Sequence, residues 1–212
     1  MPDLRFQIDE VLAMPNAATP QLCFKLGITN SEPEPVHSIA LRVQVQIEPV
    51  RRRYTAKEQE RLKDLFGAPE QWSKSLHPLL WANVNMNVSG FSGKTVVDVL
   101  VPCTFDFNVA MTKYIYGLEN GDLPVSLLFS GTVFHAGRIG LQVAQIPWDR
   151  EASYRLPVRI WKEMMNLFYP DTAWICLKRE VFDRLYEFKS QHGIPSWEQA
   201  LEQILGMAAG VK

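Results

Sequence analysis

The stretch Leu123–Trp148 constrains the fold more than any other part of this chain. It contains two β-rich runs, Leu123–His135 and Leu141–Trp148, separated by the glycine-containing break Ala136–Gly140, which is typical of a hairpin. The first run is apolar on both faces near Val125–Phe129, as expected of a strand that is covered on both sides. We therefore place this hairpin at the centre of a β-rich core.

Regular alternation of apolar and polar residues predicts strands elsewhere in the chain. The alternation is clearest at residues 39–48, where a shift of one residue would turn the whole apolar set to the other face, so the register is well determined. Similar alternation occurs at residues 4–8, 22–28, 84–88 and 95–101. Together with the hairpin, these runs predict an antiparallel sheet or sandwich of about seven strands.

Helical patterns interrupt the strands at two places. The capping box Thr55–Glu58 opens a helical insertion at residues 55–66. Apolar residues at helical spacing predict a helix at residues 108–119, which Asp106 or Asn108 can cap and which should pack on the sheet.

After the strands, the pattern becomes helical and predicts three C-terminal helices. We interpret residues 1–212 as a single α+β domain, with a β-rich core at residues 1–158 and a helical part at residues 159–212. An immunoglobulin-like sandwich is one such architecture, although the helices argue against a plain one.

Composition and spacing exclude several classes of function. The formal net charge of −1 provides no field that would attract nucleic acid or an anionic membrane. The N-terminal residues do not resemble a signal peptide, and no apolar run is long enough for membrane insertion, so we expect a cytoplasmic protein. Cys23, Cys103 and Cys176 lie far apart without a Cys-x-x-Cys pair, which argues against a metal or other cofactor and predicts buried free thiols.

No arrangement of residues dictates a reaction, so we assign no catalytic residue. Ser130 precedes a glycine as in a nucleophile elbow, but it lacks the preceding glycine and a following helix. The alternative that stays open is an enzyme or small-ligand binder with a pocket near Trp148, Asp149, Asp106 and His135.

The candidate partner-binding residues are a basic cluster and a few aromatic side chains. Arg51, Arg52, Arg53 and Tyr54 could grip a phosphate or an acidic partner surface. Three consecutive residues of an extended segment cannot all face one way, so a solvated edge that discourages sheet aggregation is the simpler interpretation. Most tryptophans should lie in the core, but an exposed apolar surface could include Trp81, Phe91 and Trp148, with Asp149 beside it.

Several distinctive phrases extend over nearly the whole chain: Ile47–Tyr54, Asp64–Gly67, Pro78–Trp81, Val101–Thr104, Leu127–Phe134, Gln145–Asp149 and Tyr154–Val158. In these phrases the chain resembles an uncharacterised family of bacterial cytoplasmic proteins that are often encoded beside nickel–iron hydrogenase genes. The resemblance implies an association with hydrogenase production, and it implies no catalytic residues.

A second pattern concerns the order of elements up to about residue 130, which includes Phe6–Ile8, Leu22–Leu26, Ala40–Ile47, Gly90–Ser92, Ala110–Leu118 and Gly121–Pro124. In this order the chain resembles the SecB-type export chaperones, which implies a SecB-like sheet. The insertion at residues 55–66 and everything after Gly131 depart from that pattern.

These observations favour a non-enzymatic protein-binding or assembly factor. Its partner would be a hydrogenase subunit or maturation protein, held by an apolar surface and steered by the basic cluster. The sequence leaves open a homo-oligomer, the enzyme described above, and a structural β-sandwich module.

Overall fold

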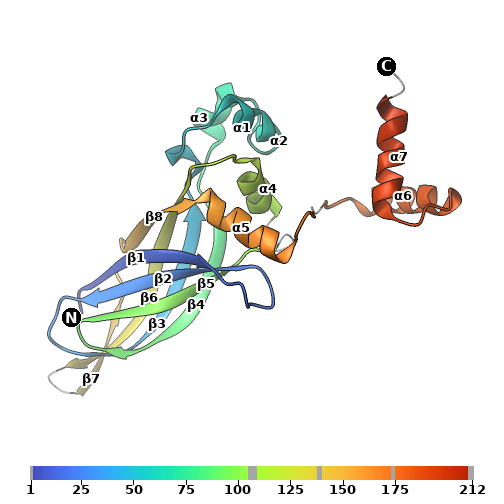
Figure 1. Cartoon of the computed structure of the whole chain (residues 1–212). Helices are drawn as coiled ribbons and strands as arrows, with labels where there is room; N and C mark the ends of the chain where they lie inside the picture. Colours follow the sequence, from blue (N-terminus) through green and yellow to red (C-terminus); the bar gives the residue numbers. More distant parts are fainter. Residues whose placement is uncertain (1, 105–108, 138–139, 173–174, 210–212) are drawn as a thin grey trace. The chain divides into compact units, whose positions relative to one another are not determined.

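The computed structural model describes residues 2–104, 109–137, 140–172 and 175–209 (Figure 1). We expected a single domain from the sequence, but the chain divides into two compact units, one up to Asp171 and one from Thr172 onwards. The division falls in the helical part, after the first of the three predicted C-terminal helices.

The first unit contains two antiparallel sheets. One sheet has three strands in the order β1-β2-β5, and the other has five strands in the order β4-β3-β6-β7, with β8 also paired to β6 (Figure 1). The described residues thus form eight strands, close to the number expected. Their bounds are Leu4–Ala13 for β1, Gln21–Asn30 for β2, Val36–Ile47 for β3, Leu79–Phe91 for β4, Lys94–Pro102 for β5, Asp122–Gly137 for β6, Gly140–Gln145 for β7 and Glu151–Pro157 for β8.

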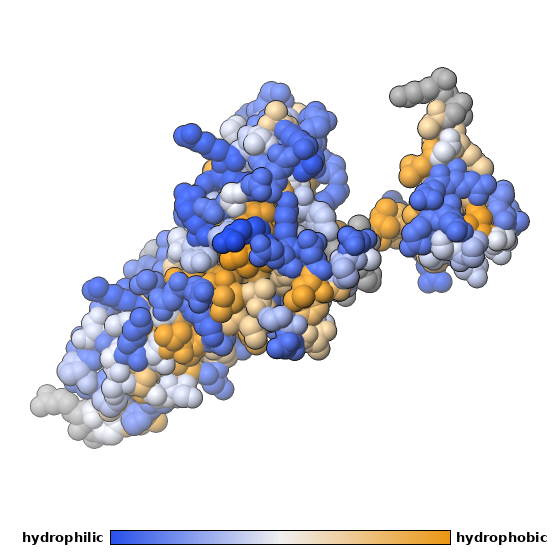
Figure 2. Space-filling view, viewed as in Figure 1, coloured by the Kyte–Doolittle hydropathy of each residue, from blue (hydrophilic) through white to orange (hydrophobic). Residues whose placement is uncertain are grey.

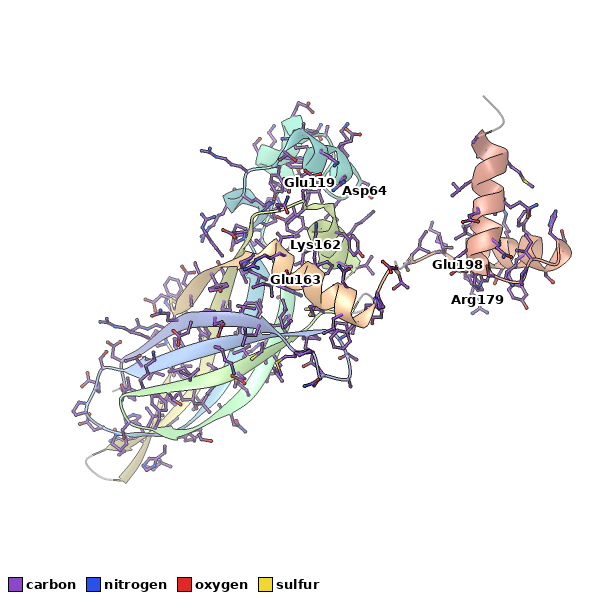
Figure 3. All side chains as sticks on the ribbon, viewed as in Figure 1. Asp64, Glu119, Lys162, Glu163, Arg179 and Glu198 are labelled. Carbon is purple, nitrogen blue, oxygen red and sulfur yellow. The ribbon has the colours of Figure 1, made fainter. Side chains whose placement is uncertain are left out.

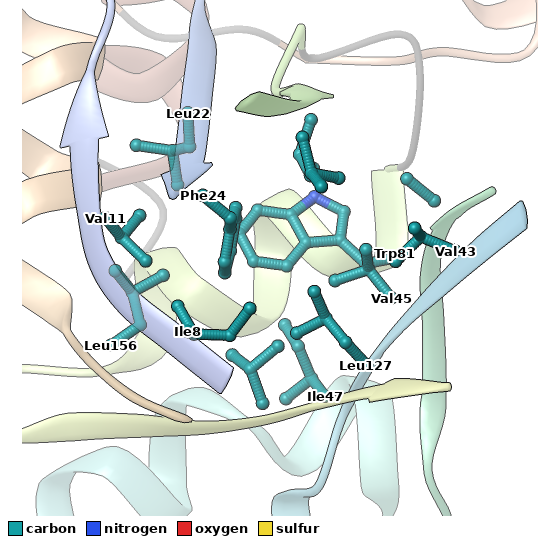
Figure 4. Packing of buried hydrophobic residues seen from close by; sticks show 14 of the residues in the cluster. Ile8, Val11, Leu22, Phe24, Val43, Val45, Ile47, Trp81, Leu127 and Leu156 are labelled. Carbon is teal, nitrogen blue, oxygen red and sulfur yellow. The ribbon is translucent and has the colours of Figure 1, made fainter. Parts of the chain in front are cut away.

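The two sheets pack face to face as a β-sandwich. Phe6 of β1 stacks on Phe129 of β6 with ring centroids 4.2 Å apart, and Phe24 of β2 meets the edge of Trp81 on β4 at 6.2 Å. Figure 4 shows the buried side chains of both sheets around Trp81. The apolar faces are therefore sealed inside the unit, and this burial is the main force that holds the sandwich together.

The outward face of the five-stranded sheet is polar. Asn83, Asn85 and Asn87 of β4 are exposed, as is Arg42 of the neighbouring strand β3. The alternation on β4 and β3 predicted this face correctly, because a strand covered on one side buries every second residue.

The predicted hairpin is present, but only its first strand is central. Strand β6 pairs with β3 along one edge. Along its other edge, the first part of β6 pairs with β8 and the last part pairs with β7. Strand β7 contributes little to the core, because Leu141 and Val143 are 63% and 60% exposed. The centre of the core is therefore β6 and not the whole hairpin.

The helical insertion lies between β3 and β4 and is longer than predicted. Thr55 accepts a hydrogen bond from the Glu58 backbone amide while the Glu58 carboxylate accepts one from the Thr55 amide, which confirms the capping box. The insertion comprises the 3-10 helices η1 at Pro49–Arg51 and η2 at Pro69–Gln71, and the helices α1 at Ala56–Arg61, α2 at Lys63–Phe66 and α3 at Trp72–Ser75.

Helix α4, at Val109–Gly117, confirms the helix predicted at residues 108–119, whereas its proposed caps Asp106 and Asn108 lie outside the described residues. Gly117 lets Leu62 of the insertion approach closely, because a Cβ at Gly117 would lie 2.6 Å from a Leu62 methyl carbon. Helix α5, at Val158–Phe168, follows β8 directly and buries Trp161 and two methionines.

The second unit consists of helix α6 at Arg179–Gln191 and helix α7 at Trp197–Ala209. With α5, these are the three predicted C-terminal helices. The ring of Trp197 lies 5.3 Å from that of Phe182 and 6.3 Å from that of Tyr186, so one aromatic side chain of α7 packs against two of α6.

The cysteines differ in accessibility, which corrects the expectation that all three are buried. Cys23 and Cys103 are buried, and burial raises the pKa of Cys103 to about 12, whereas Cys176 is exposed. We therefore expect one thiol to react rapidly with Ellman's reagent in the native protein and all three to react in denaturant, since only exposed thiols are attacked. The Cys176→Ser variant should lose the rapid phase, and a rapid phase that persists would contradict these positions.

Candidate functional site

The segment Arg51–Tyr54 places its four side chains in different environments. Arg51 and Arg53 are exposed, while the side chain of Arg52 is only 8% exposed. This agrees with the argument that consecutive side chains cannot form one patch. Arg52 is therefore not available to a partner, which corrects its assignment as a binding residue.

Arg52 forms a buried ion pair within the insertion and also ties the insertion to the segment that leads into β6. Its Nη2 atom lies 2.7 Å from Oε1 of Glu58, whose side chain is only 2% exposed. The guanidinium also donates hydrogen bonds to the backbone carbonyls of Asn120, just before β6, and of Asp122, the first residue of β6. A planar guanidinium suits this role because its donors diverge in a fixed fork.

Glu58 receives donors from three directions. Its carboxylate accepts hydrogen bonds from the Thr55 and Glu119 backbone amides at 2.9 Å each, and from Arg52. Burial on its own would raise the pKa of Glu58, but the two amides and the guanidinium together hold that pKa below its usual range. Glu58 is therefore ionised in the folded protein at neutral pH.

Tyr54 also has a structural role. Its hydroxyl is 2.8 Å from the Pro49 carbonyl and 2.7 Å from the Tyr114 hydroxyl of α4, and its ring meets Trp72 edge-on at 5.0 Å. Burial raises the pKa of Tyr54 to about 12. These contacts position the insertion against α4, and they leave little of Tyr54 for a ligand.

A second group of polar contacts surrounds the segment between α4 and β6. Glu119 pairs with Lys57 at 2.8 Å, and Lys162 of α5 donates to the Leu118 and Glu119 carbonyls at 2.6 and 3.0 Å. Figure 3 shows Asp64 on the insertion, Glu119 close to it, and Lys162 on α5. These contacts fix the elements around the ion pair of Arg52 and Glu58.

The predicted aromatic partner surface is only partly exposed. Trp81 is 3% exposed and belongs to the core, which corrects its assignment to a binding surface, and Phe91 is half-buried. Trp148, in contrast, is 93% exposed and lies between β7 and β8, next to the exposed Asp149.

The structure does not bring together the residues of the alternative pocket. His135 is 5% exposed, and its Nδ1 lies 2.9 Å from the Ala136 carbonyl. The Trp148 segment lies opposite Ser130, about 17 Å along β6 from His135 at the usual rise per residue. Asp106 lies outside the described residues, so Trp148, Asp149 and His135 form no common site among those described.

The described chain shows neither a membrane-crossing helix nor a cluster of metal-ligating side chains. None of its helices combines the length and apolarity that a bilayer crossing needs. In the same residues, no group of three or more His, Cys, Asp or Glu side chains is arranged to hold a metal ion.

The sequence reasoning missed the exposed apolar residues of the second unit. They are Val181, Phe182 and Tyr186 of α6 and Leu201, Leu205 and Met207 of α7, between 40% and 68% exposed, and we call them the C-terminal apolar set. Figure 2 shows hydrophobic residues at the surface of this unit. The spacing of Trp197, Leu201 and Leu205 was a usable signal, since residues four apart share one face of a helix.

The sequence also missed a cavity in the first unit, of about 270 Å³, into which Arg51 projects from η1. Its walls come from residues that are distant in the sequence. The pairing of β6 with β8 brings the strand residues together, and Glu48 is held beside them by a backbone hydrogen bond to the Pro124 carbonyl.

Solved structures give distant similarities. The CARDB domain of a Pyrococcus furiosus protein in complex with di-metal ions is 12% identical, with a TM-score of 0.30, over 74% of this chain and 92% of that one. β-Glucosidase 3B from Thermotoga neapolitana, in complex with α-D-glucose, is 11% identical, with a TM-score of 0.27, over 73% of this chain but only 17% of the enzyme. β-Glucosidase from Kluyveromyces marxianus, in complex with glucose, is 10% identical, with a TM-score of 0.26, over 73% of this chain and 15% of the enzyme. At such TM-scores these similarities carry no argument about this protein.

A search of the curated proteins found no match. The model of one protein family, in contrast, matches the chain over residues 1–212. That family is described as a family of unknown function, DUF6084, and this protein therefore belongs to it.

Proposed function

We propose that this protein is a non-enzymatic partner-binding or assembly factor, and that its client is a protein. The observation that carries the proposal is the C-terminal apolar set. Isolated helices of 12–15 residues are marginal in water, and most helical stability in proteins comes from packing an apolar face. Helices α6 and α7 have 13 residues each, and among their described residues only Ala200 is buried. Such helices suit the groove or surface of a partner protein.

Two features of the first unit support the same proposal. Trp148 is almost fully exposed between two edge strands, and tryptophan is enriched among the residues that dominate binding energy at protein interfaces. Leu141 and Val143 add apolar surface on the neighbouring strand β7. Of the basic cluster, only Arg51 and Arg53 are exposed and can steer an acidic partner.

The more specific part of the proposal is the partner. The resemblance described above favours a subunit or maturation protein of a nickel–iron hydrogenase, which would make this protein an accessory or chaperone-like factor. This part depends on the resemblance, whereas the apolar set argues for a protein partner of any identity.

We expect a hydrogenase-related protein to co-purify with the N-terminally tagged chain from its native host. The double variant Leu201→Ser, Leu205→Ser should weaken binding about 700-fold and so abolish recovery, since each truncated anchor of an interface costs about 2 kcal/mol and the two together about 4 kcal/mol. Mass spectrometry of the purified material measures this.

The matched control is Glu198→Ala, Glu202→Ala on the same helix, which removes exposed charges and should leave recovery unchanged. Equal recovery with both double variants would contradict the role of the apolar set. Recovery of no hydrogenase-related protein, together with full hydrogenase activity in a deletion strain, would contradict the partner. Light scattering tests self-association. If the native protein and the Glu198→Ala, Glu202→Ala control were stable dimers and the serine double variant a monomer, the C-terminal apolar set would serve self-association instead.

A further inference from the structure

The cavity beside Arg51 offers a small-molecule site, whereas the proposed function uses Arg51 only to steer an acidic partner. It lies where η1 and the paired strands β6 and β8 meet, and its volume is about 270 Å³, near the lower end of small-molecule sites. A second cavity, beside Trp81, has only about 10 Å³. The polar side chains that line the larger cavity include Glu48, Arg51, Ser126, Ser153 and Arg155.

Its charged groups have no partners within the described chain. The guanidinium groups of Arg51 and Arg155 form no ion pair or side-chain hydrogen bond there, unlike Arg52 and Arg150, which pair with carboxylates. The Glu48 carboxylate is likewise unpaired among the described residues. Two cations and one anion around one small cavity leave it with a net positive charge.

A serine hydroxyl completes the cavity. Ser126 of β6 is 2% exposed, lines the cavity and lies opposite Ser153 of β8. Within the described residues its side chain has no hydrogen-bond partner. The hydroxyl is not among the buried side-chain atoms of the described residues that lack a partner, which are Nε of Arg52 and Nε of Arg150, so it is accessible from the cavity and can donate to a ligand there.

We propose that this cavity binds a small molecule that carries a carboxylate or phosphate next to a hydrogen-bond donor. Arg51 and Arg155 take the oxyanion, because a guanidinium matches the geometry of both groups. The Ser126 hydroxyl donates to the same oxyanion. Glu48 accepts from the donor group of the ligand, such as an ammonium, so that an amino-acid-like zwitterion satisfies all four side chains.

The test is an NMR titration of the full-length, ¹⁵N-labelled protein with inorganic phosphate, glutarate and L-glutamate. We expect saturable shifts at the amides of Ser126 and Ser153. Arg51→Gln and Arg155→Gln should each weaken binding about tenfold, as expected for loss of a charge-assisted contact. Arg53→Gln is the matched control, because Arg53 is exposed in the same segment but does not line the cavity.

The Glu48→Gln variant separates the two halves of the proposed ligand. Removing the carboxylate should strengthen binding of inorganic phosphate and abolish the preference for glutamate over glutarate. Stronger binding of phosphate than of glutarate by the native protein would identify the oxyanion as a phosphate.

The proposal fails if none of the three probes gives saturable shifts, or if Arg51→Gln and Arg155→Gln bind them as well as Arg53→Gln does. Thermal melts of each variant show whether the fold is intact. Ser126→Ala, which keeps the backbone pairing, provides a second route if an arginine variant fails to fold. Unchanged affinity in that variant would also overturn the proposed geometry.

Discussion

Replacing Gly131 with alanine is expected to lower the free energy of unfolding of the first unit by about 3–5 kcal/mol. Gly131 has φ +144°, and a Cβ there would lie 2.1 Å from the backbone carbonyl oxygen of Ala40 and 3.2 Å from the Cα of Leu41. Both atoms belong to β3, so the added methyl group would force the two central strands of the larger sheet apart. Urea unfolding followed by tryptophan fluorescence measures the change.

The matched control is Gly140→Ala at the start of β7. Gly140 also has a positive φ, +99°, but among the described residues a Cβ there would meet nothing within 4 Å. We expect only the conformational cost of about 1–2 kcal/mol. Equal effects at both positions would show that backbone conformation, and not the contact between β6 and β3, determines the requirement for glycine at position 131.

Replacing Glu58 with alanine should destabilise the first unit by about 3–5 kcal/mol, because Arg52 would remain buried without its counter-charge. The two backbone amides that Glu58 accepts from would also lose their partner. Urea unfolding again provides the measurement. Lys57→Ala, which breaks an ion pair whose lysine is 66% exposed, should cost less than about 1 kcal/mol, and a similar loss in both variants would contradict the buried pair as the cause.

The pH dependence of the same residue gives an independent check. The folded-state pKa of Glu58 lies below its unfolded value, so its contribution to stability is complete above about pH 4.3 and is lost as the pH falls through the folded-state pKa. The native protein should therefore lose stability in acid more steeply than Glu58→Gln, which cannot titrate at this position. Parallel stability profiles below pH 5 would contradict the lowered pKa.

The parts of the fold that could be predicted are those determined by local pattern. The register of β3 followed from its alternation, because only one face of that strand reaches the core. The capping box at Thr55 gave the start of α1, because both of its hydrogen bonds lie within four residues. Local patterns of this kind need no knowledge of distant residues.

The errors concern residues whose environment depends on distant partners. Leu141 and Val143 alternate like core residues, yet β7 pairs only with the end of β6 and leaves both exposed. The insertion continues past Phe66 because Trp72 packs against Tyr54, a contact that depends on the tertiary structure.

The candidate site illustrates the same limit. The sequence identified the basic cluster but not the separate roles of its members, because the carbonyls that Arg52 binds follow it by 68 and 70 residues. The cavity could not be predicted either, since Ser126 and Ser153 become neighbours only through the pairing of β6 and β8.

Strands β7 and β8 cover successive parts of one edge of β6, and this arrangement has a practical consequence for engineering. The residues between them, Ile146–Arg150, are anchored at both ends by backbone hydrogen bonds to Gly131 and Phe129. A foreign peptide placed after Trp148 would therefore begin and end at fixed points of the scaffold, and neither flanking strand would need to change its register. The position suits the display of a grafted epitope, because the adjoining β-ladder holds each end of the graft independently of its length.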